Sequence, residues 1–372
     1  MSALENRPVT VIGAGIGGLT AALALARRGA QVTVLERAPE LGEVGAGIQI
    51  SANAVRVLDA LGLGTALDGA ALRTDAVQLN DERGRRVLRM DLRAHRPEAR
   101  FLLIHRARLI GLLADAARQA GVTIQLGVTA ADTDGLTIAA DGLRSTHRAA
   151  LNGQQVPFFT GQTAWRALIP DSGGAPVAQV FMAARRHLVS YPLPGGLRNI
   201  VAVEERPDWQ DEGWSHPGEP DRLRAAFAGM GGPVPGWLAQ VDHTHLWGLF
   251  RHPVAARWHD DRLALLGDAA HPTLPFLAQG AGMAIEDAWT LAACLDAIPD
   301  QPQALARYQA LRQPRVTRIV DAANANARNY HFGGVMRIGA HSVLRVADRL
   351  VPSLMPARFN WLYDFDPVGQ IP

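Results

Sequence analysis

The stretch Pro8-Val-Thr-Val-Ile-Gly13-Ala-Gly15-Ile-Gly17-Gly18-Leu19 decides the fold of this chain. Its first five residues are rich in β-branched side chains and predict a buried parallel strand. Residues 19–28 predict a helix with Gly29 just beyond its end, and residues 32–35 predict the next strand. The whole is a βαβ unit, and Gly13-x-Gly15-x-x-Gly18 occupies its first turn.

The glycine spacing in this turn predicts a dinucleotide site. Gly13 permits a tight turn, Gly15 lets the backbone approach a pyrophosphate, and Gly18 allows close packing of helix on strand. The helix N-terminus offers free N–H groups to phosphates. Glu36 closes the second strand, 23 residues after Gly13, where a carboxylate accepts a hydrogen bond from a ribose 2′-OH. The motif alone does not separate NAD from FAD.

A second glycine-rich segment lies near residue 270. Residues 263–266 predict a buried strand that delivers Gly267-Asp268 to its carboxyl end, where ligands bind in open α/β sheets. Prolines exclude a regular helix before Gly280, from which a new helix begins. The Asp268 carboxylate can accept hydrogen bonds from the hydroxyl groups of a polyol. The backbone amides of residues 280–283, at a helix N-terminus, can stabilise a ring that gains negative charge. The alternative is a second βα turn packed only for stability.

Composition narrows the classes of protein. The 372 residues, 48% hydrophobic, allow a large core and two or three domains. A net charge of +2 gives no case for a nucleic-acid or polybasic membrane surface. The chain has no lysine, which excludes Schiff-base chemistry, and one cysteine, Cys294, which excludes a disulfide, a CxxC pair and a cysteine-rich zinc site. We expect no metal site.

The N-terminus lacks the features of a secretory signal, and no window offers about 18 uninterrupted apolar residues. These patterns favour a soluble cytoplasmic protein without a membrane or nucleic-acid partner. The sequence is silent on oligomeric state, and a homodimer stays open.

With these motifs in place, the chain resembles the group A (single-component) flavoprotein aromatic hydroxylases. That family includes para-hydroxybenzoate, salicylate and 3-hydroxybenzoate 6-hydroxylases and 6-hydroxynicotinate 3-monooxygenase. The resemblance covers most of the chain. Besides the first glycine loop it rests on residues 45–53 (GAGIQISAN), 104–109 (IHRARL), 140–145 (ADGLRS), 163–166 (TAWR), 186–192 (RHLVSYP), 267–272 (GDAAHP) and 286–288 (EDA).

The resemblance implies that FAD is the cofactor and assigns roles along it. Gly13, Gly15 and Gly18 would hold the pyrophosphate, Glu36 and Arg37 the adenosine end, Arg106 the ribityl-pyrophosphate region, and Asp268 the ribityl chain. Gly47, Ile48, Gln49, Pro275, Gly280, Ala281, Gly282 and Met283 would lie at the isoalloxazine ring. Asp141 would sit where contacts to FAD and to NADH or NADPH meet, and the nicotinamide nucleotide would dock transiently.

His187 and Tyr191 are the predicted catalytic pair, with Gln49 beside them. They are four apart in strand-like sequence, so both side chains fall on one face. A hydroxylase needs a group that takes the phenol proton, and histidine has a suitable pKa while tyrosine can orient or relay. The resemblance places both residues, with Phe276, in the substrate pocket. Two satisfied residues of an antiparallel sheet are the alternative.

The predicted fold class is α/β, a Rossmann-like FAD-binding domain with an inserted, mainly antiparallel sheet and C-terminal helices. The FAD domain would comprise residues 1–155 and 256–300, the substrate domain 156–255, and the helical region 301–372. The family's β-meander would be cut to a stub at 127–140. Helices at 303–323 and 335–349 show Leu/Ile/Val spacing and are expected to pack on the FAD domain.

The resemblance implies an FAD-dependent monooxygenase that uses NAD(P)H and O₂ to hydroxylate a small phenolic or heteroaromatic substrate through a flavin C4a-hydroperoxide. Two alternatives stay open. One is a flavin hydroxylase or epoxidase acting on a non-aromatic polyketide or isoprenoid. The other is a non-catalytic flavin-binding protein.

Overall fold

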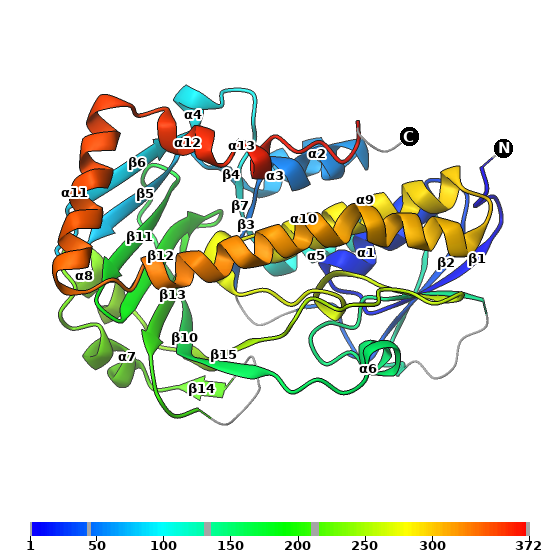
Figure 1. Ribbon diagram of the computed structural model, residues 1–372, viewed down its shortest axis with the longest axis horizontal. Coiled ribbons are helices and arrows are strands. Elements are labelled where there is room, and N and C mark those ends of the chain that lie inside the picture. The colour runs from blue at the N-terminus through cyan, green and yellow to red at the C-terminus, as the bar shows by residue number, and fades with distance from the viewer. Residues whose placement is uncertain (1, 43–45, 130–134, 210–215, 370–372) are drawn as a thin grey trace.

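The computed structural model describes residues 2–42, 46–129, 135–209 and 216–369. One half of the molecule is built on a five-stranded sheet, shown at the right in Figure 1. Its strands, in spatial order, are β16 (Leu263–Leu265), β9 (Leu136–Ala139), β1 (Pro8–Ile12), β2 (Gln31–Glu36) and β8 (Thr123–Leu126). All four pairings are parallel. The predicted Rossmann-like unit is confirmed.

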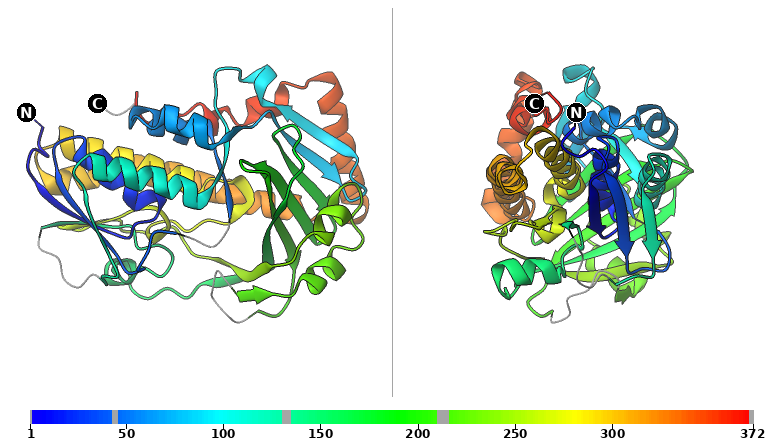
Figure 2. Two further views of the ribbon diagram at one scale, coloured as in Figure 1. Left: turned by 180° about the vertical axis from the view of Figure 1, so that it is seen from behind. Right: turned by 90° about the vertical axis from the view of Figure 1, so that its right-hand side faces the viewer.

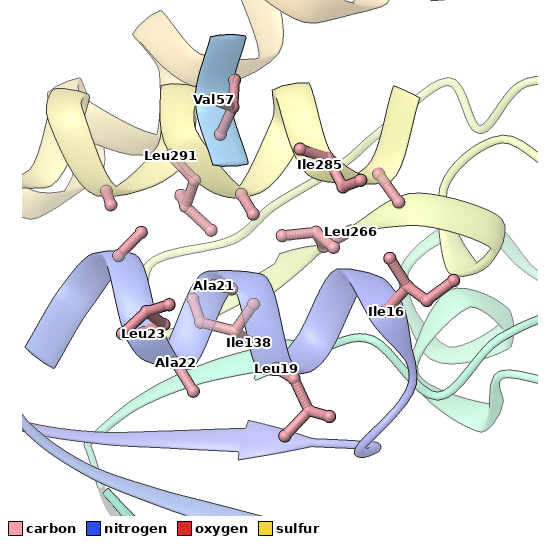
Figure 3. Packing of buried hydrophobic residues seen from close by; sticks show 14 of the residues in the cluster. Ile16, Leu19, Ala21, Ala22, Leu23, Val57, Ile138, Leu266, Ile285 and Leu291 are labelled. Carbon is pink, nitrogen blue, oxygen red and sulfur yellow. The ribbon is translucent and has the colours of Figure 1, made fainter. Parts of the chain in front are cut away.

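Helices α1 (Ile16–Ala26) and α9 (Gly280–Ala297) form the core of this half. Figure 3 shows Leu291 of α9 pointing toward α1, with Leu266 between the N-terminal ends of the two helices. Both helices are buried along most of their length, so neither shows a polar face. This packing brings together two segments that are far apart in the sequence.

The other half is built on an eight-stranded sheet. In spatial order its strands are β14 (His216–Gly218), β15 (Thr244–Arg251), β10 (Phe158–Pro170), β13 (Leu197–Glu205), β12 (Arg186–Leu193), β11 (Val177–Ala183), β5 (Ala76–Asp81) and β6 (Arg86–Asp91). Every pairing is antiparallel except that of β11 with β5. The predicted mainly antiparallel sheet is confirmed.

Two strands of this sheet come from an unexpected part of the chain. The hairpin of β5 and β6 lies within residues 1–155, which the sequence assigned to the FAD domain, yet it completes the substrate sheet by pairing with β11. In the predicted stub at 127–140, residues 127–129 and 135–140 contain only β9, a strand of the Rossmann-like sheet. Residues 130–134 lie outside the described ranges.

A three-stranded antiparallel sheet joins the halves, in the order β3 (Gly47–Ile50), β7 (Leu102–His105) and β4 (Leu72–Arg73). The remaining elements up to residue 277 are α2 (Ala52–Ala60), α3 (Gly64–Ala70), α4 (Leu92–His95), α5 (Arg106–Gln119), α6 (Thr146–Asn152), α7 (Pro220–Ala226), α8 (Val234–Ala239) and the short 3₁₀ turns η1 (Gly267–Ala269) and η2 (Pro275–Leu277).

The C-terminal elements are α10 (Gln301–Asn329), α11 (Gly334–Leu350), α12 (Leu354–Arg358) and α13 (Asn360–Tyr363). α10 packs on α9 and runs the length of the molecule into the substrate half, as Figures 1 and 2 show. α11 instead lies against β6, so the prediction that it packs on the FAD domain is wrong. Most of its apolar residues face solvent, while Leu344 and the polar residues Arg337, Arg345 and Asp348 face the sheet. Within the described ranges, no helix has the length and apolar character needed to cross a bilayer.

Candidate active site

The first glycine turn contains two crowded glycines and one open one. Gly13 has φ +98°, and a Cβ there would lie 2.4 Å from the carbonyl oxygen of Ala140. A Cβ on Gly18 would lie 1.9 Å from the Gly13 oxygen, so α1 packs directly on the turn. A Cβ on Gly15, at the N-terminus of α1, would meet nothing within 4 Å. The helix N-terminus therefore borders open space in which phosphates fit.

Glu36 holds this turn from the end of β2. Its carboxylate accepts hydrogen bonds from the Ala14 amide at 2.7 Å and the Ala38 amide at 2.8 Å. Arg37, next in the chain, is exposed. The carboxylate oxygens keep lone pairs for a further donor such as a ribose hydroxyl.

The second glycine segment meets the first at the carboxyl edge of the parallel sheet. A Cβ on Gly17 would lie 2.7 Å from Leu266 and 3.1 Å from Ala284, so β16 and α9 contact the start of α1. Asp268 follows in η1, and its side chain is exposed, with Arg106 at the start of α5 in electrostatic range. Pro275 in η2 is also exposed, and Gly280 begins α9.

The second segment is fixed by a buried ionic cluster made of Glu286, Asp287, Arg312, Arg315, His271 and Asn53. Arg312 donates to Asp287 at 2.7 Å and to Glu286 at 2.6 Å, and Arg315 donates twice to Glu286 at 2.8 Å. Burial alone would raise the pKa of both carboxyls, but Arg312 beside Glu286, and His271 together with Arg312 beside Asp287, hold each pKa below its usual value.

The cluster reaches the cofactor turn through Asp287. This carboxylate accepts a hydrogen bond from the Gly267 amide at 3.2 Å and pairs with His271 Nε2. His271 is fully buried and acts as a structural hydrogen-bonding partner of Asp287. The orientation of Asp268 therefore depends on α10, through Arg312.

Asp141 follows β9 at the same edge of the sheet. One carboxylate oxygen pairs with His147 Nδ1 at 2.8 Å, and this hydrogen bond raises the pKa of His147. The other oxygen is buried and accepts no hydrogen bond from the described residues. A buried acceptor without a donor, together with the open space at Gly15, fits a bound FAD.

The residues of β3 connect the cofactor side to the substrate sheet. The Gly47 amide donates to Asn199 Oδ1 at 2.9 Å, and a Cβ on Gly47 would lie 2.8 Å from the Tyr191 ring. Gln49 falls on the same face of β3 and lines a cavity with Gln279. Ile48 points the other way, into the core of the FAD half.

His187 and Tyr191 are buried on the inner face of the eight-stranded sheet. The His187 ring lies 5.5 Å from that of Phe276, which η2 carries toward the sheet. The residues that the sequence assigned to one substrate pocket lie on neighbouring surfaces, with Tyr191 beside β3 and His187 beside Phe276. Burial and the charge of His331 lower the pKa of His187 well below 6.5, so the imidazole is neutral near pH 7.

A chain of hydrogen bonds links His187 to the surface, and the sequence did not indicate it. His187 Nδ1 lies 2.8 Å from His331 Nε2, and His331 Nδ1 lies 3.0 Å from Glu205 Oε1. The Gln162 amide also lies 3.3 Å from His331 Nδ1. The Glu205 side chain is 34% exposed, so the chain ends at solvent. His331 is 144 residues from His187, and no local pattern signals this contact.

The carboxylate at the end of this chain fixes the direction of its hydrogen bonds. Because the Glu205 carboxylate only accepts, His331 Nδ1 carries the proton and donates. His331 Nε2 then accepts from His187 Nδ1–H, which leaves His187 Nε2 without a proton. Nε2 is then the ring atom of His187 that can accept a hydrogen bond from a bound substrate. The arrangement presents an unprotonated nitrogen, with a lone pair that can accept a proton, in the buried site.

Two kinds of comparison identify the chain's relatives. The family model described as "FAD binding domain" matches residues 6–135 and 135–323. The chain is 36% identical, over 98% of both sequences, to a 3-amino-4-hydroxybenzoate 2-monooxygenase of Streptomyces platensis. It is 35% identical to the 3-hydroxybenzoate 6-hydroxylase of Polaromonas naphthalenivorans (strain CJ2), over 96% of both sequences.

Solved structures agree. A salicylate hydroxylase substrate complex superposes with a TM-score of 0.79 at 26% identity, covering 98% of this chain and 96% of that one. Klebsiella pneumoniae HpxO, complexed with FAD and uric acid, gives 0.82 at 27% identity, covering 94% and 96%. Among the described residues, no group of three or more His, Cys, Asp or Glu is placed to hold a metal ion. This chain belongs to the FAD-dependent aromatic monooxygenases, flavoproteins that use NAD(P)H as co-substrate.

Proposed function

We propose that this enzyme hydroxylates a small phenolic acid and that His187 accepts the phenol proton. The observation that carries the proposal is the buried, neutral His187, whose Nε2 is free to accept while Nδ1 is linked through His331 to Glu205. A phenolate carbon attacks electrophilic oxygen far better than a phenol carbon does, so removal of this proton activates the substrate. Relatives named for hydroxybenzoate substrates support the choice of substrate class.

The cofactor-binding roles proposed for this chain follow the two glycine segments. Gly13, Gly15 and Gly18 hold the pyrophosphate at the start of α1, Glu36 and Arg37 the adenosine end, and Arg106 and Asp268 the ribityl region. Gly47, Ile48, Pro275 and residues 280–283 border the flavin ring, and Asp141 completes the site. Bound FAD, reduced by NAD(P)H, supplies the activation of O₂. The chain itself positions the substrate, removes its proton and excludes water.

The proton leaves in steps that the hydrogen bonds already prepare. His187 Nε2 takes the substrate proton, and Nδ1–H passes to His331 Nε2. His331 Nδ1–H then passes to Glu205 Oε1, from which water removes it. Each imidazole gains one proton and loses another, so its charge is unchanged but its tautomer is reversed, and both rings must return to the first tautomer before the next turnover. Tyr191 and Gln49 orient the ring beside β3, and Phe276 covers it from the cofactor side.

The relay is tested with two buried substitutions. His187→Phe is expected to retain FAD and lower kcat for hydroxylation by roughly 10²–10⁴, the usual size of a general-base contribution. His331→Phe is expected to lower kcat less and to leave KM unchanged, while moving the acid limb of the kcat–pH profile. Stopped-flow absorbance of the flavin across pH 5–9 measures both. His243→Phe, at an exposed histidine, is the control. An unchanged profile in His331→Phe would contradict the relay.

Arg166 is the proposed partner of the substrate's carboxylate. Its guanidinium lies over the Trp247 ring at 4.7 Å, on the substrate face of β10, and its charge acts on the neighbouring Tyr191. A cation on this inner face suits an acidic ring substituent.

Arg166→Met is expected to raise KM for a hydroxybenzoate by about 10- to 100-fold, because a hydrogen bond to a charged group contributes roughly 1.5–3 kcal/mol. KM for the matching phenol without the carboxylate is expected to change little. Steady-state NADH oxidation with both compounds gives the comparison. Equal losses for the two substrates would show that Arg166 supports the fold of the site rather than the carboxylate.

The reaction itself is tested on FAD-loaded enzyme with ¹⁸O₂. Oxidation of NADH or NADPH is followed with a panel of hydroxybenzoates, aminohydroxybenzoates and hydroxypyridine acids, and products are analysed by mass spectrometry. We expect stimulated oxidation and one ¹⁸O atom in the product of a phenolic acid. Stimulation without labelled product, or none across the panel, would contradict the proposed substrate class. We place the enzyme in the cytoplasm because that compartment supplies NAD(P)H.

A further inference from the structure

α11 lies on the sheet with one mixed face inward and an apolar side outward. Beside Leu344, which packs on the sheet, the inward face carries three polar contacts: Arg337 donates to Glu82 at 3.0 Å, Arg345 donates to Asp81 at 2.8 Å, and Asp348 accepts from the Arg89 amide at 2.8 Å. These contacts are with β5, β6 and the turn between them, and together they fix the rotation of α11. The helix cannot turn its apolar side inward without breaking all three.

The outward face is a continuous apolar stripe. Six exposed apolar side chains belong to α11, namely Val335 (86%), Met336 (64%), Ile338 (65%), Val343 (69%), Val346 (55%) and Leu350 (74%), and Val351 (47%) and Leu354 (52%) follow it. Residues 335, 339, 343, 346 and 350 recur at spacings of three and four, so they lie along one side of the helix. Scattered apolar residues are normal on a surface, but a contiguous stripe marks an interaction site.

We propose that this stripe is the interface of a two-fold symmetric homodimer, with α11 of two copies packed antiparallel. Eight exposed apolar side chains on and just after one helix can supply a large part of the ~800 Å² per partner that a stable interface buries. A two-fold axis at the centre of α11 places Val335 opposite Leu350 of the second copy and Gly339 opposite its Val346. Gly339, about one turn from the axis, leaves room for Val346 of the second copy, and Leu350 meets the smaller Val335.

A membrane surface is the other occupant that an amphipathic helix suggests, and the charges argue against it. Interfacial helices carry several Lys or Arg on the polar face for anionic headgroups. α11 has three arginines, and Arg337 and Arg345 are tied to Glu82 and Asp81 beneath it. This leaves Arg349 alone at the edge of the stripe, which is too little charge for headgroup binding.

The dimer would support the substrate site. α11 covers β6, and Leu344 of α11 packs in the same cluster as Met90 of β6. Met90 also lines the cavity beside Gln49. The second copy would therefore hold in place the edge of the sheet that closes this cavity.

The test is the mass of the FAD-loaded full chain by sedimentation velocity and by light scattering, between 1 and 50 μM in roughly physiological salt. We expect a dimer. Val346→Glu is expected to weaken association at least about 100-fold and give a monomer, because charges brought into an apolar interface are left unpaired. Val156→Glu is the matched control, since Val156 is 91% exposed outside the stripe, and it is expected to stay dimeric.

Cross-linking tests the antiparallel register. The chain has one cysteine, Cys294, which is buried. Val343→Cys, beside the predicted axis, is expected to form a disulfide-linked dimer under mild oxidation, and Val156→Cys is not. A monomeric wild-type chain over the whole range, a Val346→Glu variant that stays dimeric, or wild-type binding to vesicles of phosphatidylcholine and phosphatidylserine would each overturn the proposal.

Discussion

Arg312→Met is expected to lower the free energy of unfolding by about 3–5 kcal/mol and to release FAD. Arg312 is 1% exposed and is shared by Glu286 and Asp287, so the substitution leaves buried carboxylates with fewer donors. Asp287 would keep only His271 and the Gly267 amide, which position the turn that carries Asp268. The loss is therefore expected in both stability and cofactor retention.

Urea unfolding of the apoprotein gives the free energy of unfolding. Flavin fluorescence of the FAD-loaded enzyme measures the release of FAD. Arg307→Met is the matched control, because Arg307 is exposed on the same helix, and a surface change of this kind is expected to stay within about 0.5 kcal/mol. If both variants lost the same amount, the buried cluster would not be what holds α9 and α10 together.

Gly15→Val and Gly18→Ala are expected to separate cofactor binding from folding. A side chain at Gly15 enters open space, so Gly15→Val should leave the apoprotein stable and weaken FAD binding by roughly 10- to 100-fold as it displaces hydrogen-bonded phosphate. A Cβ at Gly18 collides with the Gly13 carbonyl, so Gly18→Ala should destabilise the apoprotein itself by about 1–3 kcal/mol.

Titration of the apoproteins with FAD, followed by flavin fluorescence quenching, measures the first effect, and thermal unfolding without FAD measures the second. Gly111→Ala is the control, since a Cβ there also meets nothing within 4 Å but lies on α5, away from the turn. Stable apoprotein with full FAD affinity in Gly15→Val would place the pyrophosphate elsewhere.

The local motifs predicted the fold of the cofactor half because each depends on residues close in sequence. The strand, turn and helix around Gly13 follow from β-branched residues, glycines and a helix-forming run, and parallel pairing then brings residues 267–283 to the same edge. The His187 and Tyr191 positions followed from strand periodicity and from the resemblance. These signals carry no information on what lies across the sheet.

The parts that sequence did not predict depend on distant contacts. His331 meets His187, and Glu205 meets His331, across 144 and 126 residues. For α11, the apolar spacing predicted a buried face, but salt bridges to Glu82 and Asp81 decide which side faces the sheet. The spacing of apolar residues predicts that a helix has an apolar face, but it does not predict which surface that face contacts.

The β5–β6 hairpin changes how this enzyme can be divided. The substrate sheet needs residues 76–91, which the chain supplies before it has finished the Rossmann-like sheet, and α10 later ties both halves together. The polypeptide therefore crosses the boundary between the FAD half and the substrate half several times. A chimera that exchanged only residues 156–255 for those of a relative would force foreign strands to pair with the native β5. Grafting a new substrate specificity would have to carry this hairpin, and α11 above it, along with the sheet.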